Sequence, residues 1–193
     1  MKYQIIYADP PWAYADKRTN PDTDRPKAYG GITYPVMTTD AICKLPIKDI
    51  SDDNCLLFIW ATFPNLQEVF KVISAWGFTY KTLGFSWIKT NKRQQLTQLS
   101  FLPGEDIDDF FGIGSYTKSN CEVCLIGLKG LAKQIVVDNT VASTIISPRR
   151  EHSRKPEEAR TRIVKLCGDR PRIELFARQK TEGWHVFGNE VES

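Results

Sequence analysis

The sequence contains no long hydrophobic run and no secretion signal. A membrane-spanning helix needs about twenty consecutive apolar residues, and no stretch of this chain approaches that length. The N-terminal segment MKYQIIYADPPW lacks the apolar core and the small-residue cleavage site of a signal peptide. We therefore expect no membrane role and a cytoplasmic location.

The cysteines form neither a disulfide framework nor a complete metal site. The chain has five of them, an odd number, which predicts a reduced protein. Cys121 and Cys124 have the spacing of half a zinc site or of a redox pair. No matching second half follows, and the pair opens the strand-like run EVCLIGL. A structural role is favoured for both, and no bound metal is expected.

The chain also has only a small excess of positive over negative charge. The chain carries 26 Lys and Arg against 23 Asp and Glu, a formal net charge of +3. This balance is too slight to indicate a polyanionic partner, so any contact with nucleic acid must use locally clustered charge. A length of 193 residues with 41% hydrophobic side chains fits a single domain over residues 1–193.

Strand-like and helix-like segments alternate along the chain, which is typical of a largely parallel sheet covered by helices. Apolar residues at helical spacing, with glycine at the end, predict helices over 66–76 and 157–167. Trp60, Trp76 and Trp87 fall at positions typical of a core. The predicted strands are residues 3–8, 56–60, 79–89, 122–128, 172–177 and 184–187, with a further short extended piece at 133–138.

The turn Asp9-Pro10-Pro11-Trp12 follows the first predicted strand directly. In open α/β folds, ligands bind at the carboxyl edge of the sheet, where this turn would place a carboxylate and an aromatic ring. An exocyclic amine such as adenine N6 is a poor nucleophile, because its lone pair is delocalised into the ring. Asp9 and the Pro10 carbonyl offer two acceptors for its N–H groups, and the two prolines keep the turn rigid. Trp12 offers an apolar face for a base; alternatively, the turn is structural and Trp12 only packs.

Two long polar segments, residues 13–33 and 90–120, interrupt the alternation. Loops of this length are uncommon in compact domains and are usually functional or disordered. Both combine cations with aromatic rings, which suits phosphate contact and base stacking on single-stranded or everted nucleotides. An ordinary solvated loop explains the composition equally well. The residues concerned are Tyr14, Lys17, Arg18, Arg25, Lys27 and Tyr29 in the first segment, and Lys92, Arg93, Phe110, Phe111, Tyr116 and Lys118 in the second.

Several ordered blocks of the sequence resemble one protein family. They are YADPPW at 7–12, YPVMT at 34–38, LFIWAT at 57–62, AWGFTYKT at 75–82, WIKTN at 87–91, CEVCLIGLKG at 121–130, SPRREHSRKPEE at 147–158, IELFAR at 173–178 and WHVFGN at 184–189. Together they resemble the adenine-N6 methyltransferases that include the catalytic subunit of the eukaryotic messenger-RNA N6-adenine writer and many prokaryotic and phage homologues. This chain looks like a prokaryotic or phage member.

The resemblance implies a Rossmann-like α/β fold, with a mostly parallel sheet, helices on both faces, and S-adenosyl-L-methionine as the cofactor. It implies no glycine-rich cofactor loop, and the sequence has none. By resemblance the catalytic residues are Asp9, Pro10, Pro11 and Trp12. The cofactor would be bound by Asp9, Ser153, Lys155, Phe176, Arg178, Asn189 and Glu190. By resemblance the target base would meet Tyr34, Lys89, Thr90 and Asn91, and the rings of Trp12 and Tyr116 are added as candidates for stacking on it.

The expected function is transfer of a methyl group to the N6 amine of adenine in nucleic acid, with DNA favoured over RNA because the chain resembles the prokaryotic members. Three alternatives stay open at this point: an RNA adenine-N6 methyltransferase, a cytosine-N4 methyltransferase that uses a related Asp-Pro-Pro motif, and a non-catalytic nucleic-acid-binding subunit. The intact Asp-Pro-Pro-Trp motif argues against the last of these. A homodimer or a heterodimer is compatible with the resemblance.

Overall fold

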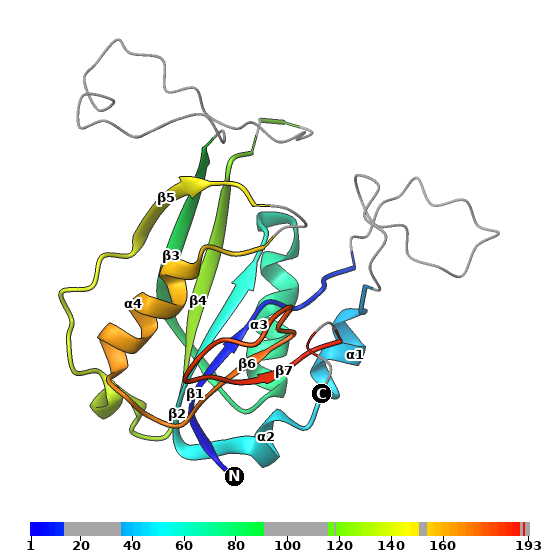
Figure 1. Cartoon of the computed structure of the whole chain (residues 1–193). Coiled ribbons are helices and arrows are strands. Elements are labelled where there is room, and N and C mark those ends of the chain that lie inside the picture. The colour runs from blue at the N-terminus through cyan, green and yellow to red at the C-terminus, as the bar shows by residue number, and fades with distance from the viewer. Residues whose placement is uncertain (14–35, 91–115, 118, 151–153, 190, 192–193) are drawn as a thin grey trace.

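A computed structural model of the chain describes residues 1–13, 36–90, 116–117, 119–150, 154–189 and 191. These residues form one seven-stranded sheet with the strand order β5-β3-β4-β2-β1-β6-β7 (Figure 1). Only β4 runs antiparallel to its neighbours, and the remaining described strand pairs are parallel. The strands are β1 Tyr3–Ala8, β2 Ser51–Ala61, β3 Thr79–Thr90, β4 Cys121–Lys129, β5 Thr144–Pro148, β6 Arg172–Leu175 and β7 His185–Phe187.

Helices cover both faces of this sheet, as Figure 1 shows. On one face lie α1 Thr39–Cys43, α2 Ile47–Ile50 and α3 Leu66–Ala75, which follows the short 3-10 helix η1 Phe63–Asn65. On the other lie α4 Glu157–Cys167 and the 3-10 helix η3 Ala132–Ile135. The predicted mostly parallel α/β fold with helices on both faces is confirmed. Within the part of the chain that the structure describes, no helix is long and apolar enough to cross a membrane.

Alternating side chains of the two central strands build the two cores. Ile6 of β1 and Leu57 of β2 face α3, whereas Tyr7 and Trp60 face α4. Trp60, Trp76 and Trp87 are buried, which confirms their predicted core positions. The two predicted helices also form, and Gly77 and Gly168 follow them with positive φ angles of 84° and 75°.

The prediction for residues 133–138 was wrong. Instead of an extended piece, Ala132–Ile135 form η3, whose Ala132 and Ile135 are buried at helical spacing. The backbone N–H groups of Val137 and Asp138 then donate to Leu166 O at the end of α4, so no strand partner is available to them. The strand of this region is β5, which the sequence analysis missed because only Ile145 of its five residues is buried.

A buried ion pair fastens α4 to the sheet. Arg160 of α4 donates from Nε and Nη2 to the two carboxylate oxygens of Glu174 on β6, at 2.6 and 2.5 Å. Both side chains are less than a tenth exposed. The Arg160 guanidinium also lies 5.7 Å from the centre of the Tyr7 ring. Because β1 and β6 are neighbours, this one arginine ties the helix to both strands.

We expect Glu174→Leu to lower the free energy of unfolding by about 3–5 kcal/mol, because it leaves Arg160 buried without a counter-charge. Urea unfolding followed by circular dichroism measures this loss. The double variant Arg160→Met, Glu174→Leu should recover most of the stability, since both charges are then gone. A double variant as unstable as Glu174→Leu alone would contradict the assignment.

Candidate active site

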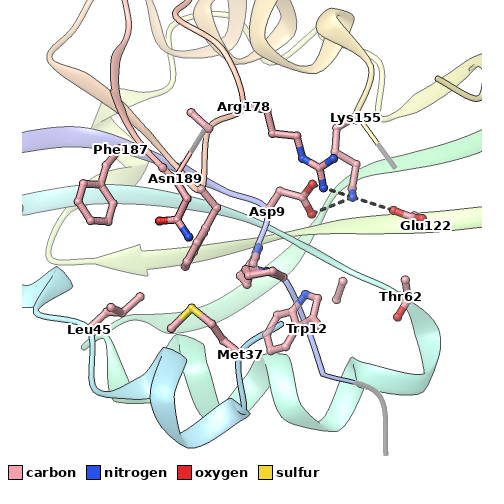
Figure 2. A pocket seen from close by; sticks show the side chains of 16 residues that line it. Asp9, Trp12, Met37, Leu45, Thr62, Glu122, Lys155, Arg178, Phe187 and Asn189 are labelled. Atoms are coloured by element: carbon pink, nitrogen blue, oxygen red, sulfur yellow. Dashed lines mark hydrogen bonds and ion pairs between the residues drawn. The ribbon is translucent and has the colours of Figure 1, made fainter. Parts of the chain in front are cut away.

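A cavity of about 350 Å³ opens at the carboxyl ends of β1, β2, β6 and β7 (Figure 2). This is the edge at which open α/β sheets bind their ligands. Its walls come from the turn after β1, the end of β2, the start of β4, the segments on either side of α1, the segment before α4, and the segments at the ends of β6 and β7. They are Asp9, Pro10, Pro11, Trp12, Met37, Leu45, Ala61, Thr62, Glu122, Lys155, Phe176, Ala177, Arg178, Phe187, Gly188 and Asn189.

The Asp-Pro-Pro-Trp turn is anchored to the segment before α1. Met37 N donates to Pro11 O at 2.8 Å, and Ala13 N donates to Met37 O at 3.0 Å, so this turn pairs with residue 37 like a short parallel bridge. Trp12 N donates to Pro10 O at 2.9 Å. The Pro10 carbonyl therefore accepts one hydrogen bond from the described residues, and a carbonyl oxygen has two lone pairs.

Trp12 is a packed residue of this site. Its side chain lies in the core on the α3 face and is only 6% exposed. The indole Nε1 donates to Trp60 O at 3.0 Å. The packing alternative for Trp12 is thus observed, although Trp12 also lines the cavity. Stacking of a target base on it stays a prediction.

Lys155 links the turn to a second carboxylate. Its Nζ lies 2.8 Å from Asp9 Oδ1, 2.9 Å from Asp9 Oδ2 and 3.1 Å from Glu122 Oε2. Lys89 Nζ lies 2.5 Å from the other oxygen of Glu122. The charges therefore alternate along a chain from Asp9 to Lys89, and Figure 2 shows Lys155 between Asp9 and Glu122.

Burial and ion pairing have opposite effects on the pKa values of the residues in this network. Burial raises the pKa of Asp9 above its usual value, and the Lys155 ammonium opposes that rise. Burial also works to raise the pKa of Glu122, but the two ammonium groups of Lys155 and Lys89 hold it below its usual value. For Lys155, burial is overcome by the Asp9 and Glu122 carboxylates, which raise its pKa. Glu122 and Lys155 are thus held in their charged forms, and Asp9 is a more basic acceptor than an exposed aspartate.

Glu122 was not among the predicted site residues. The predicted site was built on a turn that directly follows a strand, at the carboxyl edge of a parallel sheet. Glu122 stands instead at the beginning of β4. Because β4 is antiparallel, its beginning meets the carboxyl ends of β1 and β2. A charged residue near the start of an otherwise apolar strand is the signal by which Glu122 could have been found, since a buried charge needs a partner.

Residues after β6 and β7 close the other side of the cavity. Phe176 has a positive φ of 60°, which is uncommon for an aromatic residue and typical of functional segments. Ala177 N donates to Phe187 O at 3.0 Å. A Cβ atom on Gly188 would lie 2.1 Å from Ala177 O, so only glycine allows these two segments to approach so closely.

The structure brings together five of the predicted cofactor-binding residues on the cavity wall: Asp9, Lys155, Phe176, Arg178 and Asn189. Ser153 and Glu190 lie outside the described residues. Of the residues predicted to meet the target base, Trp12 lines the cavity, and Lys89 reaches it through Glu122.

The structure does not place the other residues predicted to contact the base on the cavity wall. Thr90 is fully buried at the end of β3, where it pairs with Pro148 of β5, and it is not on the cavity wall. Tyr116 is fully exposed and also absent from the wall. Tyr34 and Asn91 lie outside the described residues, as do the cations of the two long loops. Base contacts by these residues stay predictions.

Comparison with known proteins decides the family. The family model MT-A70 matches residues 3–190, nearly the whole chain. The chain belongs to the MT-A70 family. Its similarity extends to the Type II methyltransferase M.MunI of a Mycoplasma species, with 30% identity over 98% of this chain and 78% of that protein.

Eukaryotic proteins are similar over the same region. An Arabidopsis thaliana N(6)-adenosine-methyltransferase MT-A70-like protein is 26% identical over 98% of this chain, which spans only 24% of that protein. The zebrafish N(6)-adenosine-methyltransferase non-catalytic subunit METTL14 is 29% identical over 77% of this chain and 32% of its own length. This MT-A70 chain therefore spans most of the bacterial relative and about a quarter of the plant relative. The family predicted from the sequence is confirmed.

We expect Glu122→Gln to lower the pKa of Asp9, because the Glu122 charge raises that pKa and also competes for Lys155. Carbon-13 NMR of protein labelled at aspartate carboxyl groups reports this pKa directly, and Asp9→Asn identifies the signal. Glu158→Gln is the matched control, because Glu158 pairs with Arg162 on the surface of α4. An Asp9 titration that is the same in Glu122→Gln and in the wild type would contradict this account of the network.

Proposed function

We propose that this MT-A70 chain transfers a methyl group from S-adenosyl-L-methionine to the N6 amine of adenine in DNA. Adenine-N6 methylation follows from membership of the family and from the N6-adenosine methyltransferases that match nearly the whole chain. The choice of DNA rests on coverage: the chain spans 78% of the bacterial Type II methyltransferase but only 24% of the plant protein. The free cysteines of the described residues are compatible with a reducing, cytoplasmic setting.

The cavity fits the two halves of the proposed cofactor. One end is ionic, with Asp9 and Lys155, and suits the amino and carboxylate groups of an amino acid. The other end has Phe176 and Asn189, which offer an aromatic ring and a polar amide to a nucleoside, whereas the side chain of Arg178 extends toward Asp9 (Figure 2). When bound, S-adenosyl-L-methionine supplies an electrophilic methyl group. The protein supplies orientation and electrostatics.

The observation that carries the proposal is the position of the Asp9 carboxylate. Asp9 is 23% exposed toward the cavity, and Lys155 is within reach of both of its oxygens. Asp9 is thus able to keep the ion pair through one oxygen while the other accepts an N–H of the substrate amine. The second lone pair of Pro10 O offers a second acceptor on the same turn.

Two fixed acceptors direct the two N–H bonds of the amine, so that the nitrogen lone pair points out of the base plane. Positioning of this kind accounts for most of the rate in a direct transfer that needs no covalent enzyme intermediate. After the methyl group has arrived, the surplus proton passes from the nitrogen to water. In duplex DNA the target base must first be everted, at a cost of a few kcal/mol.

A non-catalytic subunit is the second candidate, because the chain is also similar to the non-catalytic METTL14 protein. Such a subunit would bind nucleic acid or a catalytic partner without methyl transfer. The intact Asp-Pro-Pro-Trp turn on the wall of the cavity favours the enzyme. A homodimer and a heterodimer are both compatible with the proposal.

Nucleoside analysis tests the proposal. The protein is incubated with tritiated S-adenosyl-L-methionine and with matched single-stranded and double-stranded DNA and RNA. We expect the label to appear as N6-methyldeoxyadenosine, and DNA to be methylated faster than RNA. Label in N4-methylcytosine would assign the cytosine class, and faster methylation of RNA would overturn the choice of DNA. Cofactor binding without any transfer would favour the non-catalytic subunit.

Asn189→Ala should weaken the binding of S-adenosyl-L-methionine about tenfold, which corresponds to loss of one hydrogen bond of about 1.4 kcal/mol. Isothermal titration calorimetry measures the change. Asn139→Ala is the matched control, because Asn139 is exposed and does not line the cavity. Equal affinities of the Asn189→Ala variant and the wild type would show that the cofactor does not bind on this side of the cavity.

A further inference from the structure

Trp60 lies at the junction of several contacts that meet at the site. It is fully buried near the end of β2 and belongs to the core on the α4 face. Its backbone carbonyl accepts the hydrogen bond from the Trp12 indole at 3.0 Å. Its own Nε1 donates to the Tyr7 hydroxyl at 2.7 Å. The Lys155 ammonium lies 5.7 Å from the centre of its ring. One residue of β2 therefore contacts the catalytic turn, β1 and the ammonium group.

The contact between the Trp60 ring and the Lys155 ammonium affects the position of Lys155. The lysine precedes α4 and is not part of a strand, so the sheet ladder does not fix its side chain. Asp9 and Glu122 attract the ammonium from two sides. The electron-rich face of an indole attracts a cation within about 6 Å, and this attraction increases when water is excluded. The ring of Trp60 thus supplies a third boundary, which limits where the ammonium rests between its two carboxylates.

Tyr7 fixes the orientation of that ring. Tyr7 stands two residues before Asp9 on β1 and is buried on the same face of the sheet as Trp60. The Arg160 guanidinium lies 5.7 Å from its ring centre, and Trp184 packs edge-on at 5.9 Å. Because the buried phenol ring packs against both of these side chains, its hydroxyl is a fixed acceptor for Trp60 Nε1.

We propose that Trp60 is a positioning residue for methyl transfer: its indole, oriented by the Tyr7 hydroxyl, holds the Lys155 ammonium against Asp9. The inference rests on the proposed function of Asp9. The residue acts through Lys155, and it touches neither the substrate nor the reacting atoms.

Loss of this support has a predictable effect on Asp9. The charged groups that face Asp9 are Lys155 before α4, Glu122 on β4 and Arg178 after β6. Lys155 and Arg178 lower the pKa of Asp9, whereas Glu122 raises it. If Lys155 moves away from Asp9, the largest opposing charge is weakened, and the pKa of Asp9 rises further.

Carbon-13 NMR of protein labelled at aspartate carboxyl groups tests the proposal without reliance on activity. The wild type is compared with Trp60→Phe and Tyr7→Phe, and Asp9→Asn identifies the signal. We expect the Asp9 titration to move to higher pH in both variants, because each removes the hydrogen bond that orients the indole. Trp76→Phe is the matched control: Trp76 is equally buried and donates to Ile42 O at 2.9 Å, but on the other face of the sheet. Its Asp9 titration should equal that of the wild type.

Kinetics then separate positioning from simple loss of stability. For Trp60→Phe we expect kcat to fall about tenfold with DNA, because a small displacement at the site is costly. The acid limb of its pH–rate profile should move to higher pH. The double variant Tyr7→Phe, Trp60→Phe should be no slower than Trp60→Phe alone, since the two residues act through one contact.

The proposal is overturned if the Asp9 titration is unchanged in both Trp60→Phe and Tyr7→Phe, or if Trp76→Phe shifts it equally. Should Trp60→Phe fail to fold, the Tyr7→Phe titration decides in the same way. Failure of the proposed function has a different signature, which is absence of methyl transfer by the wild type while the Asp9 titration still responds to Trp60.

Discussion

The site depends on one ammonium group shared by two carboxylates. Asp9 directly follows β1 and Glu122 lies at the start of β4, and β2 lies between these strands in the sheet. Lys155 spans this gap and contacts both carboxylates. Without it, two negative charges would share a site with little exposure to water, and burial and repulsion would favour their protonation. With it, Asp9 faces the cavity as a basic carboxylate beside a fixed positive charge.

The fold provides the conditions for this arrangement. The antiparallel direction of β4 places Glu122 at the edge where the parallel strands end. The hydrogen bonds between Met37 and the Asp-Pro-Pro-Trp turn keep Asp9 at that edge. On the opposite wall, the segments after β6 and β7 lie close together, with Phe176 at a positive φ and Gly188 next to Ala177. The cavity thus has an ionic end and an end with an aromatic ring and polar groups, which the methyl-transfer proposal requires.

The sequence predicted what local patterns determine. The apolar run at 56–60, the helix that ends before Gly77 and the position of Asp9 after β1 all follow from periodicity and proline chemistry. The same patterns missed β5, which has one buried side chain, and Glu122, whose importance depends on strand direction. The residues around Trp12 did not reveal that its indole is hydrogen-bonded to Trp60 O, because the two residues are far apart in sequence. These failures have one cause: pairing between distant segments leaves little trace in local composition.

The central claim is that Asp9 acts on the reacting amine rather than only holding the site together. Asp9→Asn tests this most directly, because asparagine keeps the size of the side chain and removes its charge. We expect Asp9→Asn to bind S-adenosyl-L-methionine within about tenfold of the wild type. We also expect the single-turnover rate of methyl transfer to adenine to fall by about 10²–10³, the typical loss when a fixed electrostatic partner is removed. A variant that transfers methyl groups at the wild-type rate would contradict the claim.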